Sequence, residues 1–268
     1  MLTDIEAREA LHILVLQQIG DELKAGACIL KGGVNLRLFF GSPRYSEDID
    51  LDLDPAAQPA FVSAVHKTLT SRRLLDRLTE LGIERLEYSG RPAKNTATTV
   101  RFKLGVVNRG AIRLPTRIEA SMRDHAAGDT GVQGPADTAV TAQYLSPTDK
   151  ALVVSHYPLQ PAVRQKLQAL ATRKLPQARD VFDLHVLAKG DRATVDLTRL
   201  RNVLSTDHLR EAARRTWEIG YGQFRDQVVE FLSEEDQRAL GSEEAWTLRQ
   251  LFVVDLIEAV LQTPESRS

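Results

Sequence analysis

Cysteine and long hydrophobic runs are both scarce in this sequence. Cys28 is the only cysteine among 268 residues, which excludes an internal disulfide and a thiolate metal site. We interpret it as a buried strand residue. No stretch approaches the roughly 20 uninterrupted apolar residues that span a membrane, and residues 1–12 lack the basic and then apolar layout of a signal peptide. We therefore expect a cytoplasmic protein that has no membrane partner.

Net charge is also small, so the total charge does not point to a nucleic-acid partner. It is −1, with 43% apolar and 26% charged residues, which is typical of an ordinary globular protein. The charges are unevenly spread, however. Residues 160–215 contain twelve Lys or Arg and six Asp or Glu, whereas residues 218–268 contain four and eleven. The basic middle would suit a polyanion, and the alternative is that both segments are solvated helical surfaces.

The most informative stretch is residues 29–54, ILKGGVNLRLFFGSPRYSEDIDLDLD. It predicts a short strand, a two-glycine turn that opens a helix, a polar loop and a second strand. In the second strand a period of two places Asp48, Asp50 and Asp52 on one face and the apolar residues on the other. Like charges so close together repel unless a cation lies among them, and oxygen ligands at this spacing suit Mg²⁺, with Mn²⁺ as a possible substitute.

The glycine turn and the polar loop supply groups that suit an anion. Gly32 and Gly33 leave backbone N–H groups at a helix N-terminus free to face phosphate. In the loop, Ser42, Arg44 and Ser46 add donors, and Arg44 is able to bind in a bidentate manner. A phosphate cradle beside paired carboxylates indicates metal-assisted phosphoryl or nucleotidyl transfer.

These residues resemble a known family. Residues 31–33 (KGG) and 41–50 (GSPRYSEDID) are similar to the patterns KGG(T)(A)L and GSxRxSxDxD of the AbiEii and MenT nucleotidyltransferase toxins, which belong to the DNA polymerase β-like superfamily. The sequence departs from the pattern at Val34 and Asn35, so one hydroxyl near the phosphates is absent. A later run, residues 166–184, resembles the family motifs KLxALxxR and RDxxDL.

The later run is predicted to lie on two helices. Lys166 and Arg173 lie two turns apart on one helical face, and Asp180 and Asp183 lie one turn apart on the next helix. A lysine over the triphosphate would offset charge, and a nearby aspartate would orient it or accept a proton. The alternative is a purely structural Lys–Asp ion pair. Lys150 is a second candidate for the family's lysine.

The rest of the chain predicts a mixed N-terminal half and a helical C-terminal half. A capping box at Thr3 and Glu6 opens a helix of about twenty residues. Helical spacing follows over 61–81, strands over 83–88, 98–107 and 112–120, a loop over 122–139 and a strand over 140–145. A helix is expected over 151–156, and only helices after it. We predict an α/β nucleotidyltransferase core over 1–145 with a mixed sheet, and an α-helical domain over 146–268.

The predicted site draws on both halves. Glu119, on a strand next to the aspartate pair, is a candidate third carboxylate or a solvent-facing residue. We predict the following catalytic residues: Asp48, Asp50, Lys166 and Asp180. We predict the following metal ligands: Asp48, Asp50 and Glu119. The predicted nucleotide- and phosphate-binding residues are Lys31, Gly32, Gly33, Ser42, Arg44, Ser46, Arg173 and Asp183. A basic cluster of Arg210, Arg214 and Arg215 is a further candidate for contact with an RNA backbone.

The resemblance implies a toxin of a type IV toxin–antitoxin, or abortive-infection, system. It would use Mg²⁺ to transfer a nucleotide from a nucleoside triphosphate, CTP or another pyrimidine, to the 3′ end of tRNA and so block translation. A separately encoded antitoxin of the AbiEi type is the implied protein partner. Two alternatives remain open, a nucleotidyltransferase that acts on a protein or small-molecule acceptor, and a nucleotide-binding sensor without catalysis.

Overall fold

The computed structural model describes residues 2–122, 129–189 and 195–265, and their packing divides the chain into two units. The first unit consists of residues 1–41 and 45–157, and the second of residues 42–44 and 158–268. The sequence predicts a boundary after residue 145. The structure keeps 146–157 with the first unit because this segment contains a strand of its sheet, and it groups the short segment Ser42–Arg44 with the helices.

The first unit combines an eight-stranded sheet with five α-helices in its described residues. Its strands are β1 (Cys28–Lys31), β2 (Ile49–Leu53), β3 (Ile83–Tyr88), β4 (Lys94–Thr96), β5 (Thr99–Asn108), β6 (Arg113–Ser121), β7 (Val132–Pro135) and β8 (Val153–His156). Its helices are α1 (Asp4–Glu22), α2 (Gly32–Phe39), α3 (Gln58–Leu69), α4 (Arg72–Glu80) and α5 (Thr138–Thr141), with the 3-10 turn η1 (Pro55–Ala57).

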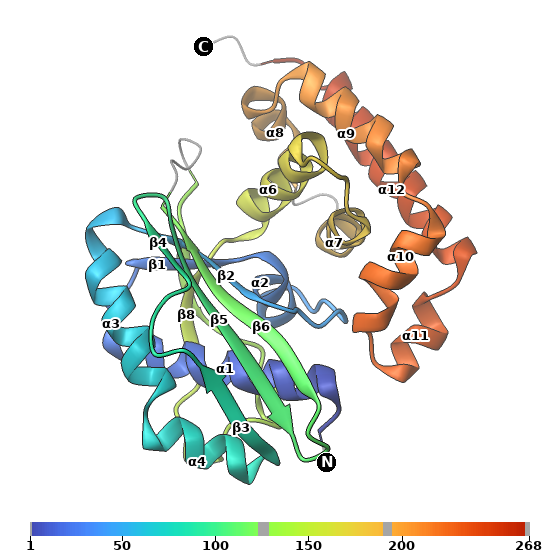
Figure 1. Ribbon diagram of the computed structural model, residues 1–268. Helices are drawn as coiled ribbons and strands as arrows, with labels where there is room; N and C mark the ends of the chain where they lie inside the picture. Colours follow the sequence, from blue (N-terminus) through green and yellow to red (C-terminus); the bar gives the residue numbers. More distant parts are fainter. Residues whose placement is uncertain (1, 123–128, 190–194, 266–268) are drawn as a thin grey trace. The chain divides into compact units, whose positions relative to one another are not determined.

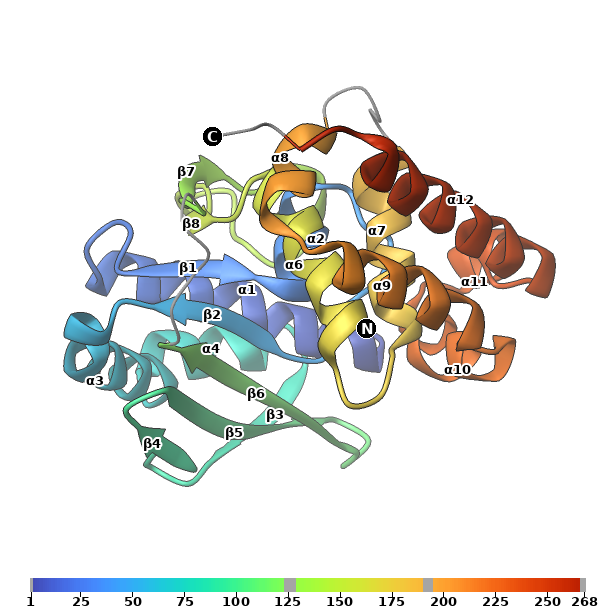
Figure 2. The same ribbon diagram turned by 90° about the horizontal axis from the view of Figure 1, so that it is seen from above.

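The sheet is mixed, as predicted. Its strand order is β3-β5-β6-β2-β1-β8-β7, and β4 pairs with residues 99–101 of β5, on the edge of β5 that faces away from β6 (Figures 1 and 2). β2 lies antiparallel to β1 and parallel to β6, and β1 lies parallel to β8. β2 is therefore an interior strand, which places its polar side chains beside those of two neighbouring strands.

The core of this unit lies between the sheet and helices α1, α3 and α4. Alternate residues of each strand point into it, for example Val100, Phe102 and Leu104 on β5, all at most 2% exposed. On β2 the alternation predicted from the sequence is confirmed, since Ile49, Leu51 and Leu53 are fully buried in the same core. The aspartates between them therefore belong to the opposite face of the sheet.

Several predicted elements need correction. The expected helix over 151–156 is wrong, because residues 153–156 form β8 and its backbone pairs with β1 and β7. The strand expected over 140–145 is also wrong, because α5 and a turn occupy this segment. The loop expected over 122–139 contains β7, and residues 123–128 of it lie outside the described part of the chain. The helix over 61–81 is two helices, because Ser71 caps α4 by accepting a hydrogen bond from Leu74 N.

The second unit is helical throughout its described residues, as predicted. Its helices are α6 (Leu159–Thr172), α7 (Ala178–Lys189), α8 (Leu197–Val203), α9 (Thr206–Glu218), α10 (Tyr221–Gln227), α11 (Glu234–Leu240) and α12 (Glu243–Gln262), with the 3-10 turn η3 (Val229–Phe231). Trp246 and Phe224 stack with ring centroids 4.6 Å apart in the core of this unit. Trp217, on α9, is 49% exposed, so it is not part of this core.

Candidate functional site

A strand, a tight turn and a helix position the first part of the site. β1 ends at Lys31, and α2 begins at Gly32, whose φ of +70° lies in the left-handed region. Lys31 pairs with Asp50 across the sheet, so the aspartate faces this turn. A Cβ built on Gly32 would lie 2.9 Å from Oδ2 of Asp50. Glycine is therefore required here for its backbone conformation and for the close approach of the carboxylate.

Gly32→Ala is expected to lower activity more than stability alone explains. The methyl group would displace the Asp50 carboxylate, and a displacement of about 1 Å at a reacting centre costs about 100-fold in rate. Gly26→Ala is the matched control, because Gly26 also has a positive φ, +79°, but has no atom within 4 Å of its Cβ position. Both variants should lose about 1–2 kcal/mol of unfolding free energy, measured by denaturant titration. Equal transfer rates in the two variants would contradict the role assigned to Gly32.

Asp48 is a half-buried carboxylate that lacks full compensation of its charge. Burial raises its pKa to about 6; Arg117 lowers the pKa, whereas the charges of Asp50 and Glu47 raise it further. Its Oδ2 lies 2.9 Å from Nη2 of Arg117 on β6. Its backbone carbonyl accepts a hydrogen bond of 3.0 Å from the Ser46 hydroxyl. A half-buried carboxylate with acidic neighbours is the environment in which an added divalent cation is favoured.

Glu119 lies in register beside Asp50, on β6. Its Oε2 is 2.5 Å from Nε of Arg101 and 4.0 Å from Nε of Arg117, so it already forms ion pairs. Within residues 2–122, 129–189 and 195–265, no group of three or more acidic, histidine or cysteine side chains converges on one metal position. Asp48 and Asp50 fit Mg²⁺ as a pair, because this ion is usually held by one or two carboxylates together with substrate phosphates and water.

Asp52, the third aspartate of the strand, has a different environment. It is 5% exposed, accepts a 2.8 Å hydrogen bond from the Tyr157 hydroxyl and forms an ion pair with Lys31. Tyr157 also accepts a hydrogen bond at its carbonyl from Nδ2 of Asn35, at 3.0 Å. Asn35, one of the two departures from the family pattern, therefore contacts the end of β8. The sequence had suggested no role for Tyr157, since nothing in its local pattern distinguishes it.

A buried histidine positions the residue that precedes Asp48. The Thr116 hydroxyl donates to the carbonyl of Glu47 at 2.6 Å and lies 2.8 Å from Nε2 of His12. Because the hydroxyl hydrogen is used at Glu47, the neutral imidazole donates from Nε2. Burial lowers the pKa of His12 to about 3, and the charge of Arg8 lowers it too.

This histidine predicts an acid-sensitive stability. In the unfolded chain His12 takes up a proton as pH falls through 6.5, whereas in the folded chain it stays neutral until about pH 3. The free energy of unfolding therefore decreases as pH falls. From pH 7 to pH 4 the loss attributable to His12 is about 3 kcal/mol. In His12→Gln, where the amide N–H still reaches Thr116, the urea-derived stability should decline less over this range. His66→Gln, at an exposed position on α3, should retain the wild-type slope. Parallel curves for wild type and His12→Gln would contradict the prediction.

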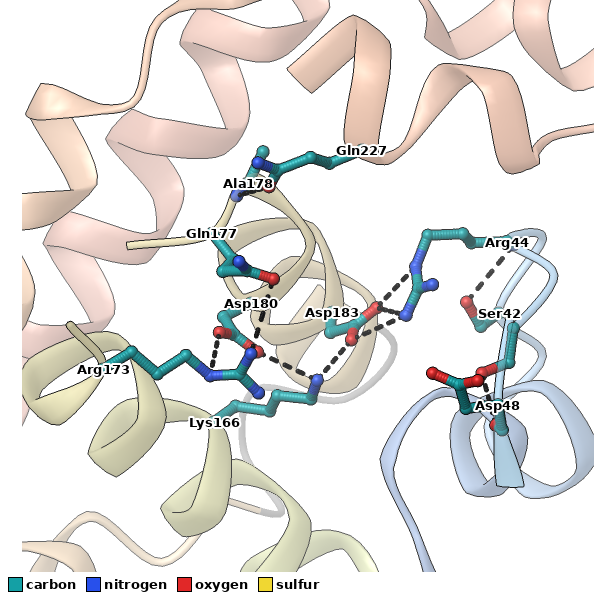
Figure 3. A network of polar contacts seen from close by, with 11 residues as sticks. Ser42, Arg44, Asp48, Lys166, Arg173, Gln177, Ala178, Asp180, Asp183 and Gln227 are labelled. Atoms are coloured by element: carbon teal, nitrogen blue, oxygen red, sulfur yellow. Dashed lines mark hydrogen bonds and ion pairs between the residues drawn. The ribbon is translucent and has the colours of Figure 1, made fainter. Parts of the chain in front are cut away.

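A buried ionic cluster lies within the helical unit and is shown in Figure 3. Asp180 and Asp183 on α7 are both 0% exposed. Lys166 Nζ on α6 lies 3.1 Å from Oδ1 of Asp180 and 2.6 Å from Oδ2 of Asp183. Arg173 Nε lies 3.2 Å from Oδ2 of Asp180. The two helices of the later motif therefore bring together the residues that the sequence had predicted as neighbours.

Arg44 belongs to the same cluster. Its Nε and Nη2 donate to the Asp183 carboxylate at distances of 3.0 to 3.2 Å, and its side chain is 5% exposed (Figure 3). Ser42 is also buried and accepts a hydrogen bond from the backbone N–H of Arg44. Burial pushes the pKa of Asp183 up, but Arg44 and Lys166 more than compensate and hold it below the usual range. Arg44 thus anchors the segment Ser42–Arg44 within the helical unit.

Two other predicted candidates have different surroundings. Lys150 is exposed, lies between α5 and β8, and its carbonyl accepts a hydrogen bond from Gln17 Nε2. The proposed basic cluster on α9 is neutralised in part, because Glu211 pairs with both Arg214 and Arg215, and Glu218 pairs with Arg214.

Comparison with known proteins identifies the family. The family model described as the nucleotidyl transferase AbiEii toxin of type IV toxin–antitoxin systems matches residues 14–259. The chain belongs to the AbiEii toxin family. The resemblance inferred from the two motif runs is thereby confirmed, and with it membership in a family of nucleotidyltransferases that act in toxin–antitoxin pairs.

Solved structures share the fold of this AbiEii family member. JHP933 from Helicobacter pylori is 18% identical with a TM-score of 0.56, and the match covers 98% of this chain and 95% of that one. MenT4, a nucleotidyltransferase toxin from Mycobacterium tuberculosis, is 17% identical with a TM-score of 0.60, covering 97% and 85%. The search of curated proteins returns no match. The predicted α/β nucleotidyltransferase fold with a helical C-terminal part is confirmed.

No helix among the described residues combines the length and the apolar character that a membrane-spanning helix needs.

Proposed function

We propose that this protein transfers a nucleoside monophosphate from a nucleoside triphosphate, CTP or another pyrimidine, to the 3′ end of tRNA. The observation that supports it best is the position of Asp50 on β2 against Gly32 in the first turn of α2, with Asp48 directly before this strand and paired with Arg117 of β6. Family membership supplies the reaction class. The acceptor and the nucleotide are our proposals.

Asp48 and Asp50 would hold Mg²⁺, for which Mn²⁺ can substitute, and Glu119 is the carboxylate beside them. The bound ion would stabilise charge on the triphosphate as the α-phosphate is attacked. Gly32 and Gly33 present backbone N–H groups and the positive end of the α2 dipole to phosphate oxygens. Lys31, whose ammonium pairs with Asp52, and the Ser46 hydroxyl are the nearby donors that would bind or orient these oxygens.

The ionic cluster brings cations together around two carboxylates. Three cations, Arg44, Lys166 and Arg173, share Asp180 and Asp183. We propose that Lys166 and Arg173 bind phosphate oxygens and that Asp180 orients Lys166. Asp183 holds Arg44 and Lys166 together, and Ser42 with Arg44 shapes the loop that leads to Asp48.

In the proposed reaction the acceptor hydroxyl attacks the α-phosphate in line, a P–O bond forms to the acceptor, and the bond to pyrophosphate breaks. A carboxylate of the site accepts the hydroxyl proton. Pyrophosphate leaves with the electron pair. The tRNA extended in this way would not be aminoacylated, and an antitoxin of the AbiEi type is the proposed partner that prevents this outcome.

The test is a transfer assay with purified protein, Mg²⁺, total tRNA and each α-labelled nucleoside triphosphate, with Asp48→Ala as the blank. Label on tRNA that is lost in Asp48→Ala is the expected result, strongest with a pyrimidine nucleotide. Label found on a protein or a small molecule would mean that this molecule, and not tRNA, is the acceptor. Binding of nucleotide without any transfer would indicate a sensor and overturn the proposal.

A further inference from the structure

One face of strands β4, β5 and β6 carries an array of cations that the reaction described above does not use. The array, called the cationic face here, consists of Lys94, Arg101, Lys103, Arg113 and Arg117. Strand register places these side chains together, because Lys94 pairs with Arg101 and Lys103 pairs with Arg117. Paired residues share a face of a sheet, as do residues two apart on one strand. This is the face opposite the core of α1, α3 and α4.

The cationic face is accessible and has a positive excess. Lys94 and Lys103 are exposed, and the side chains of Arg113, Arg117 and Arg101 are 54%, 42% and 32% exposed. Glu119 is the one carboxylate that points the same way within the fully described residues 94–121. Glu87 of β3 pairs with Arg113 at 2.7 Å. Two lysines are exposed, and each of the three arginines, although ion-paired, keeps between 32% and 54% of its side chain exposed.

Arg113 covers the middle of this surface. A Cβ at Gly105, in the middle of β5, would lie 2.9 Å from Nε and 3.1 Å from Cζ of Arg113, so the guanidinium lies directly over the strand backbone. No aromatic side chain points to this face within residues 94–121, because Phe102 belongs to the core. A cationic surface without aromatic platforms favours contacts to phosphate over stacking with bases.

The cationic face is continuous with the aspartate pair. Across the sheet, Asp50 pairs with Glu119, Glu119 with Arg101, and Arg101 with Lys94. Neighbouring strands lie about 4.8 Å apart, so Arg101 is about 10 Å from Asp50 in this row. Arg117, which pairs with Asp48, begins the parallel row that leads to Lys103. A polyanion that passes over β5 and β6 thus ends beside the two aspartates.

We propose that the cationic face binds the phosphodiester backbone of the single-stranded 3′-terminal segment of the RNA acceptor. The segment would cross β5 and β6 and present its terminal hydroxyl at Asp48 and Asp50. This inference rests on the proposed function, since it assigns the surface that holds the acceptor. Because the contacts are to phosphate, they would position the RNA without selecting its sequence.

The experiment compares Lys94→Glu/Lys103→Glu with a matched double reversal, Lys67→Glu/Arg72→Glu, on exposed positions of α3 and α4. Binding of a short fluorescein-labelled single-stranded RNA is measured by anisotropy over a range of salt, without nucleotide. The test variant should weaken binding at least about tenfold and lower the slope of log K against log salt by about 1.4 or more, since each cation contributes about 0.7. The control should stay within about twofold. Equal weakening in both variants, or a wild-type affinity that does not respond to salt, would overturn the proposal.

A transfer assay separates this inference from the proposed function. If wild type labels RNA, Lys94→Glu/Lys103→Glu should raise KM for RNA about tenfold and leave kcat at saturating RNA unchanged. A lowered kcat with unchanged KM would overturn the inference, although the proposed function would stand. If wild type transfers no nucleotide to RNA but the binding difference is present, the cationic face is an RNA surface and only the proposed function fails. Matching thermal melts of the two variants exclude misfolding.

Discussion

Asp50→Asn is expected to lower kcat/KM for nucleotidyl transfer by about 1,000-fold. The substitution keeps the size of the side chain against Gly32 but removes one of the two negative charges proposed to hold the metal ion. Stabilisation of transition-state charge by a metal ion is worth several kcal/mol, and each 1.36 kcal/mol is a factor of ten in rate. The measurement is the initial rate of label transfer over a range of nucleotide and Mg²⁺ concentrations.

The matched control is Asp54→Asn, which makes the same change of charge just beyond the end of β2. Asp54 is exposed and accepts a hydrogen bond from Ala56 N that an asparagine can also accept. Its kcat/KM should stay within about twofold of wild type. If Asp50→Asn retains wild-type rates, or if both variants lose activity equally, the aspartate pair is not the metal site. A rate that recovers at high Mg²⁺ in Asp50→Asn alone would support it further.

Asp183→Asn is expected to lower the free energy of unfolding by about 3–5 kcal/mol. Asp183 is 0% exposed and forms ion pairs with Arg44 and Lys166, so the substitution removes the charge of the carboxylate that both buried cations contact. Removal of one partner from a buried ionic group is strongly destabilising, because the other charge stays buried without compensation. Equilibrium unfolding in urea measures the effect.

A second variant shows whether the loss arises from the ion pair. Arg44→Met/Asp183→Asn removes one charge of each sign, so it should recover about 1–3 kcal/mol relative to the sum of the two single variants. Asp226→Asn, at an exposed position of α10, should change stability by less than about 0.5 kcal/mol. If the destabilisations of the two single variants simply add in the double variant, the two residues are not coupled.

The pKa of Asp183 in the folded protein lies below its usual value. Its contribution to the free energy of unfolding is therefore present above the unfolded pKa and is lost as pH falls through the folded pKa.

The local parts of the site followed from the sequence. The alternation over 48–53 predicted that the aspartates lie opposite the apolar face, and the burial of Ile49, Leu51 and Leu53 places Asp50 and Asp52 there. The glycines predicted a turn that opens a helix, and α2 begins at Gly32. Helical spacing also predicted that Lys166 and Asp180 lie on neighbouring helices. These predictions succeeded because each depends on periodicity or backbone conformation within a few residues.

Partners that are distant in the chain did not follow from the sequence. Nothing in the local pattern indicates that Arg44 bonds to Asp183, that Tyr157 bonds to Asp52, or that Arg101 pairs with Glu119. The sequence pattern predicts a helix where the strand β8 lies, because four residues are too few for periodicity to distinguish a strand from a helix. Its assignment depends on backbone pairing with β1.

The sequence by itself determined the family, the strand and helix that carry the aspartates and glycines, and the helical character of the second half. Only the tertiary structure decided which charged side chains form ion pairs with one another. It alone showed that Arg117 faces Asp48, that Lys31 pairs with Asp52, and that a row of cations continues the line from Asp50. The physical reason is that side-chain periodicity specifies the face on which a residue lies, whereas its partner on that face is specified by strand register and helix packing between segments far apart in the chain.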